Sequence, residues 1–126
     1  MTHPVSPEQT ASILTAGADY IETHGWHQGS LRNQHGAVCA MGAITTIAPP
    51  DANRKTSAAE RAALAALARY LDLKPEPGDI SPIATNPGLL VSAWNDRAED
   101  ADQVITAMRH TATHLTPAIR RAREAL

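Results

Sequence analysis

The only cysteine of the chain, Cys39, lies in a region rich in histidine and glycine, and this gives it candidate chemistry. An imidazole can activate a thiol, and a side-chain amide can orient the imidazole. Cys39, His27 and Asn95 therefore supply the parts of a catalytic cysteine site. However, Val38 and Ala40 beside the thiol are apolar, and free cysteine is among the most buried residue types. We expect a structural thiol, with the nucleophile as the alternative.

The same region also offers ligands for a metal ion. The residues with nitrogen or sulfur ligands are His24, His27, His35 and Cys39. A His-x-x-His spacing is workable for zinc, but the full spacing matches no standard zinc finger and provides one thiolate. We therefore predict no metal and no cofactor. His110 and His114 lie about 200° around their helix from its apolar row, which places them in solvent.

Amide and aromatic side chains form a third group of candidates. If the chain holds a small ligand, the candidate binding residues are Trp26, Gln28, Trp94, Asn95 and Asp96. Only 3% of the residues are aromatic, so the two tryptophans are expected instead to fill the core under irregular loops. The amides would then hold loop backbone. Asp96 is expected to cap a helix.

These residues fall into three short motifs. They are His-Gly-Trp-x-Gln-Gly at 24–29, Gly-x-x-Cys-Ala-x-Gly-Ala at 36–43 and Trp-Asn-Asp at 94–96. With these motifs the chain resembles a family of short actinobacterial and actinophage proteins of unknown function. The resemblance spans most of the chain. It implies an actinobacterial or phage origin and no particular activity.

The elements that must position these residues are helices. Ser6 before Pro7 is typical of a helix start, and apolar residues at helical spacing then predict a helix over 7–23. A capping box that begins at Ser57 predicts a second helix over 58–71. Both segments carry one apolar face, as a helix packed on a core requires.

The remaining segments are less regular. The run 37–48 is almost wholly apolar and predicts a buried helix, whereas the segment before it reads as a glycine-rich loop. We expect one long helix from about Asp96 to the C-terminus, kinked or rebuilt at Pro117. The segment before residue 89 is too broken by proline and glycine for any helix. The short run 89–91 could form a strand, although one strand without partners means little.

The composition fits a folded all-α protein. Of the 126 residues, 43% are hydrophobic and 19% are charged, with alanine abundant. We predict one domain over 1–126, with a flexible N-terminus at 1–5, built as a compact bundle of about four helices. Its connections would be irregular and rich in glycine and proline, with at most a minor short β element.

Charge and motifs narrow the function. The net charge of −2 argues against nucleic acid and anionic membranes as partners, and no apolar run is long enough to span a bilayer. One cysteine and the absence of a signal-like start favour the cytoplasm. We expect a small binding or regulatory protein that docks on another protein. A homodimer is also compatible with the sequence. The alternative is a small cysteine- or metal-dependent enzyme that uses Cys39 with a nearby histidine.

Overall fold

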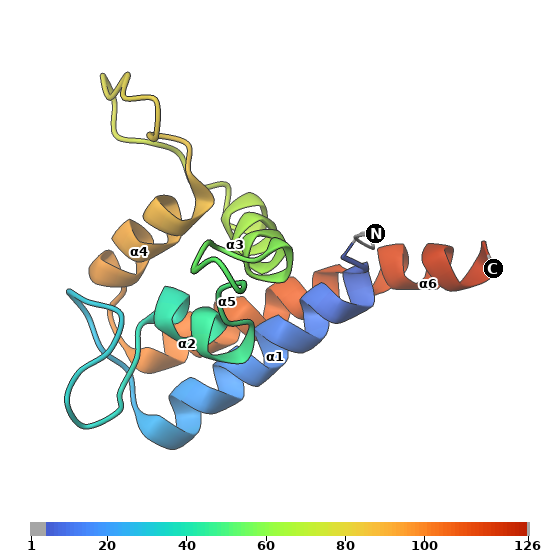
Figure 1. Cartoon of the computed structure of the whole chain (residues 1–126), viewed down its shortest axis with the longest axis horizontal. Coiled ribbons are helices and arrows are strands. Elements are labelled where there is room, and N and C mark those ends of the chain that lie inside the picture. The colour runs from blue at the N-terminus through green and yellow to red at the C-terminus, as the bar shows by residue number, and fades with distance from the viewer. Residues whose placement is uncertain (1–4, 126) are drawn as a thin grey trace.

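Two long helices run side by side through the fold and carry much of its core (Figure 1). They are α1 (Pro7–His24) and α5 (Ala101–His114) in the computed structural model, which describes residues 5–125. The start of α1 is as predicted, because the Ser6 hydroxyl accepts a hydrogen bond from the Gln9 amide at 3.0 Å. The helix ends before Gly25, which adopts a positive φ of 101°.

Two further helices, α2 (Ala40–Ile47) and α3 (Ala58–Tyr70), pack on α1. The Ser57 hydroxyl caps α3 by accepting from the Glu60 amide at 3.1 Å, which confirms the predicted start of this helix. The Glu60 carboxyl is buried and accepts a hydrogen bond from the Thr45 hydroxyl of α2 at 2.6 Å. This contact joins the two helices.

The predicted helix over 37–48 is too long at its N-terminal end. Residues 37–39 are extended and form backbone hydrogen bonds with the preceding loop, among them Val38 N to Gly25 O and His27 N to Val38 O, both at 3.0 Å. Val38 thereby forms isolated β-bridges to Trp26 and Arg32. The apolar run is buried over residues 37–40, but hydrophobicity does not distinguish a buried extended segment from a buried helix.

The suggestion of a strand at 89–91 is wrong, because this run lies inside the helix α4 (Pro87–Arg97). The Asn86 side chain accepts from the amides of Gly88 and Leu89 and caps the helix. Pro87 occupies the first turn, where its missing N–H costs no hydrogen bond. Proline and glycine therefore mark a helix start here rather than a break.

The last predicted helix is divided, and its start is displaced. Asp96 lies in the last turn of α4, and the residue that caps α5 is Asp100, which accepts from the Gln103 amide at 2.8 Å. At the other end, Leu115 separates α5 from α6 (Thr116–Glu124), with Pro117 in the first turn of α6. The helix is thus rebuilt next to the proline, as expected, and α6 extends beyond the other helices (Figure 1).

The predicted all-α class is confirmed. Within residues 5–125 there are six helices, where the sequence suggested about four, and β structure is confined to the bridges at Val38. Residues 1–4 of the predicted flexible N-terminus lie outside the described part of the chain, and Ser6 belongs to the cap of α1. None of the helices described between residues 5 and 125 is both long and apolar enough to cross a membrane.

Gly42 in the first turn of α2 provides a test of this packing. A Cβ atom at this position would collide with the backbone carbonyl of Leu31 in the adjoining loop. We expect Gly42→Ala to lower the free energy of unfolding in urea by about 1–3 kcal/mol, because backbone cannot move aside as a side chain can.

The matched control is Gly17→Ala in α1. There the added Cβ would meet the terminal methyl group of Met108 at 2.8 Å, and this flexible side chain can shift. We expect a smaller loss, offset by the better helix propensity of alanine. Equal losses for the two variants would contradict the close approach of the loop to α2.

Candidate functional site

The side-chain amide of Asn95 lies fully buried at the meeting point of α4, α2 and the loop over 25–39. Its Oδ1 accepts hydrogen bonds from Trp26 Nε1 at 2.8 Å and from the Ala40 amide at 3.0 Å. Its Nδ2 donates to the His27 carbonyl oxygen at 3.0 Å. One side chain thus fixes the loop at two points and the first residue of α2 at a third.

Gln28 makes a second connection between the loop and α4. Its Nε2 lies 3.1–3.2 Å from the carbonyl oxygens of Asn95, Asp96 and Ala98, which belong to the end of α4. The last carbonyls of a helix lack intrahelical partners, and a side-chain donor can satisfy them. The Asn95 carbonyl also accepts from the Ala98 amide at 3.2 Å. In the opposite direction, the Asp96 carboxyl accepts a hydrogen bond from the Gly29 amide at 2.8 Å. We call Trp26, Gln28, Gly29, Asn95 and Asp96 the loop–helix lock.

The lock brings together four of the five predicted ligand-binding residues and uses their polar groups on one another or on backbone. Trp94, the fifth, is partly buried against the hydrophobic core. The aromatic contacts formed within residues 5–125 do not include one between Trp26 and Trp94, so the structure gives no aromatic clamp. A ligand-binding role for these residues stays a prediction.

Cys39 is the N-cap of α2, and its Sγ accepts a hydrogen bond from the Gly42 amide at 3.3 Å. The residue is 3% exposed. Burial raises the pKa of the thiol above its usual value, although backbone hydrogen bonds act in the opposite direction. Beside it lies a small cavity of about 150 Å³ that is also lined by Ser92 and Asp96. Gly42 allows the close approach of the loop at Leu31.

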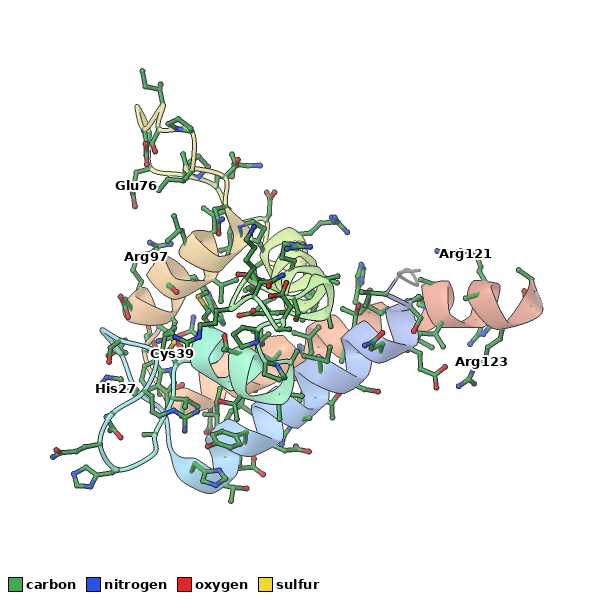
Figure 2. All side chains as sticks on the ribbon, in the orientation of Figure 1. His27, Cys39, Glu76, Arg97, Arg121 and Arg123 are labelled. Carbon is green, nitrogen blue, oxygen red and sulfur yellow. The ribbon has the colours of Figure 1, made fainter. Side chains whose placement is uncertain are left out.

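The histidines do not gather around this thiol. His27 lies in the loop and pairs with the Ser30 hydroxyl at 2.8 Å, whereas Cys39 lies at the start of α2 (Figure 2). His24 stacks on Tyr20, with ring centroids 3.9 Å apart, and His35 is exposed. In the part of the chain that the structure describes, no three histidine, cysteine or acidic side chains are close enough to hold a metal ion.

A surface that sequence analysis did not identify lies on the projecting arm, which we define as residues 74–86. The arm connects α3 to α4 and extends away from the helices (Figure 1). It carries Ile80, which is 95% exposed, and Ile83, which is 58% exposed. Leu89 at the start of α4 is 49% exposed and lines a common cavity with Ile83.

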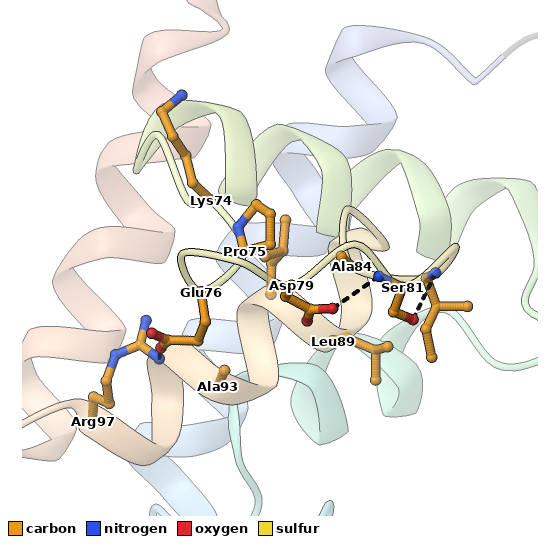
Figure 3. Close-up of a pocket in the computed structure, with 11 residues that line it drawn as sticks. Lys74, Pro75, Glu76, Asp79, Ser81, Ala84, Leu89, Ala93 and Arg97 are labelled. Carbon is orange, nitrogen blue, oxygen red and sulfur yellow. Dashed lines mark hydrogen bonds and ion pairs between the residues drawn. The ribbon is translucent and has the colours of Figure 1, made fainter.

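The arm is built from prolines and short side-chain turns. Its conformation is restricted at Pro75, Pro77 and Pro82, because the proline ring fixes φ. The Asp79 carboxyl accepts from the Ser81 amide at 3.0 Å, and the Ser81 hydroxyl accepts from the Ile83 amide at 3.3 Å (Figure 3). The exposed isoleucines are thus presented on a preordered loop.

Between the arm and α4 lies a cavity of about 260 Å³ with an apolar centre and a charged rim. Leu89, Leu90 and Ala93 of α4 form part of its floor. At the rim, Glu76 faces Arg97 with 3.8 Å between carboxyl oxygen and guanidinium nitrogen (Figure 3). The sequence signal for this site was the unusual density of proline around isoleucine, which we interpreted only as a connection that breaks helices.

Fold and site together define a small all-α protein in which side-chain amides hold a long loop to a helix. The chain belongs to the family of unknown function DUF6197, whose model matches residues 5–114. The match includes the lock and the arm and ends at the last residue of α5, so α6 lies beyond it. No curated protein and no solved structure matches the chain. The resemblance to a family of unknown function is confirmed, and the actinobacterial or phage origin stays a prediction.

The lock makes Asn95 the polar residue with the largest expected effect on stability. We expect Asn95→Ala to lower the free energy of unfolding by at least about 3 kcal/mol, because three hydrogen-bonding groups lose their partner at once. Asn53→Ala, at an exposed position, should change the free energy by less than about 0.5 kcal/mol. Equal urea midpoints for the two variants would show that the amide holds nothing in place.

The burial of Cys39 predicts a slow thiol. Iodoacetamide reacts with the thiolate, and a raised pKa leaves less thiolate at neutral pH in the native protein than in the unfolded chain. We expect native labelling near pH 7 to be much slower than labelling in urea, as measured by mass spectrometry over time. A native thiol that reacts faster than the unfolded one would restore Cys39 as a candidate nucleophile.

Proposed function

We propose that this chain is a binding module that docks on another protein through the projecting arm and the adjoining face of α4. The observation that carries the proposal is the exposure of Ile80 on a preordered loop that also presents Ile83, which lines the adjoining cavity together with Leu89. A folded protein gains nothing by ordering apolar side chains in water, whereas a contiguous exposed apolar surface is typical of an interaction site.

Charge favours a protein as the partner. Glu76 and Asp79 shortly precede the exposed Ile80, and the net charge of the chain is −2. Acidic residues next to the contact surface oppose phosphate backbones and anionic lipid headgroups. An apolar centre with a polar rim, as in the cavity beside α4, is the usual composition of a protein–protein interface.

The contacts of the candidate catalytic residues give the enzyme alternative little support. The Oδ1 and Nδ2 atoms of Asn95 are both hydrogen-bonded to the loop or to α2. The His27 ring hydrogen-bonds to Ser30, and the bond recorded at the Cys39 thiol comes from the Gly42 amide. A nucleophile needs an imidazole within hydrogen-bond reach and room for a substrate. The cytoplasm remains the compartment we propose, on the basis of the single cysteine.

The test is capture of a partner by the immobilised chain from a lysate of its source cells. We expect Ile80→Ser to reduce recovery of a specific partner by about ten-fold or more, because apolar anchors at the centre of an interface dominate its free energy. The matched control is Leu31→Ser, which removes a half-exposed aliphatic side chain from the 25–39 loop.

Recovery that depends on Ile80 and not on Leu31 supports the arm as the docking site. Recovery of the same partner by the wild-type chain and by Ile80→Ser in equal amounts would contradict it. Recovery of the chain itself and of no other protein would contradict a foreign partner. Near-ultraviolet circular dichroism of each variant should match the wild type, because both side chains lie on the surface.

A further inference from the structure

A second surface lies at the opposite end of α3 from its cap, in a groove of about 600 Å³ between α3, α5 and α6. Small or apolar residues form its floor, and none of them carries charge. The floor residues are Ala66, Thr111, Leu115, Pro117 and Ala118.

The walls of this groove are basic and aromatic. Arg69 and Tyr70 contribute from α3, His114 from α5 and Arg121 from α6. The Tyr70 and His114 rings meet edge to face at 5.2 Å between centroids. Within residues 5–125, neither Arg69 nor Arg121 belongs to an ion pair, and no acidic side chain lines the groove.

These features specify the chemistry of an occupant. An apolar floor takes an aliphatic side chain, and two guanidinium groups beside it take carboxylates, since arginine pairs well with planar anions. The occupant must therefore present one exposed aliphatic residue with acidic residues next to it. A loop is more suitable than a flat surface, because the groove is recessed between three helices.

The projecting arm of the same chain has this composition. Ile80 is almost fully exposed, Asp79 precedes it and Glu76 lies three residues before Asp79. Both acidic side chains are exposed. The arm cannot be assigned to the groove of its own chain, because it extends away from α6 (Figure 1).

Arm and groove also lie next to each other along the chain. Tyr70, in the groove wall, ends α3, and the arm begins four residues later. Two complementary surfaces at neighbouring positions allow a two-fold contact, in which each subunit gives its arm and receives the other. Such a contact closes on itself and does not lead to a filament.

We propose that a second copy of this chain occupies the groove, with Ile80 on the floor and Asp79 or Glu76 paired with Arg69 and Arg121. The proposal rests on the proposed function in one respect, namely that the arm is a docking element. It adds a regulation, because an arm held by a second copy is not free for a foreign partner. Self-association and partner docking then compete for the same residues.

The experiment is sedimentation velocity of the full chain over a concentration series, with two charge-reversal variants. We expect wild type to form a dimer, and Asp79→Arg or Arg121→Glu each to raise the dimer dissociation constant by about ten-fold or more through like-charge contacts. Arg121 lies on a helix without buried residues, so its replacement leaves the core intact. Arg120→Glu is the matched control, since Arg120 does not line the groove.

A mixture of the two charge-reversal variants gives the decisive result. In a mixed dimer, the native arm of the Arg121→Glu subunit meets the native groove of the Asp79→Arg subunit. The changed arm meets the changed groove, and their charges are again opposite. The mixture should therefore regain the wild-type dissociation constant. Ile80→Ser should not be rescued by any groove variant, because it removes the apolar anchor.

Three results would overturn the arm–groove contact: a wild-type chain that stays monomeric at every concentration, a dimer indifferent to Arg121→Glu, or no recovery in the mixture. The proposed function has its own criterion, the dependence of partner capture on Ile80 measured at dilute concentration. A monomer whose partner capture depends on Ile80 contradicts the second copy alone. If the mixture regains the dimer but no foreign partner is captured, only the proposed docking on another protein is contradicted.

Discussion

The buried amide of Asn95 is the interaction on which the rest of this fold depends. It connects α4 to the 25–39 loop through Trp26 and His27 and to the start of α2 through Ala40. A helix of eight residues such as α2 is too short to be stable alone, so it requires contacts that fix its ends. Small core residues allow the elements to approach closely, and directed hydrogen bonds then set how they meet.

The helical part of the fold could be predicted wherever a cap and a periodic apolar face occur together. Ser6 and Ser57 mark true helix starts for this reason. The prediction was wrong at 37–39, because apolar residues serve equally well in a buried extended segment whose backbone pairs with a distant loop. It was also wrong at 89–91, where Pro87 was interpreted as a break although proline is equally suited to a first helical turn.

The candidate site was predictable in part. Interpreting Asn95 as an amide that holds loop backbone agrees with its bond to the His27 carbonyl oxygen. Gln28 instead binds backbone at the end of α4. Their meeting across nearly seventy residues could not be read from spacing. The exposed Ile80 was missed for a different reason: sequence patterns report which residues are apolar, and exposure is decided by whether another element covers them.

The distance in sequence between the two sides of the lock also bears on how the chain is made. Trp26 and Asn95 are 69 residues apart, and the Gln28 bond to Ala98 spans 70. A chain synthesised from its N-terminus completes α1, α2 and α3 before the residues that secure the loop have left the ribosome. Until then the Trp26 Nε1, Gln28 Nε2 and Gly29 N donors lack the acceptors that residues 95–98 supply. The nascent chain therefore passes through a stage with an open loop and a half-formed core, and this stage ends only when α4 and α5 have emerged.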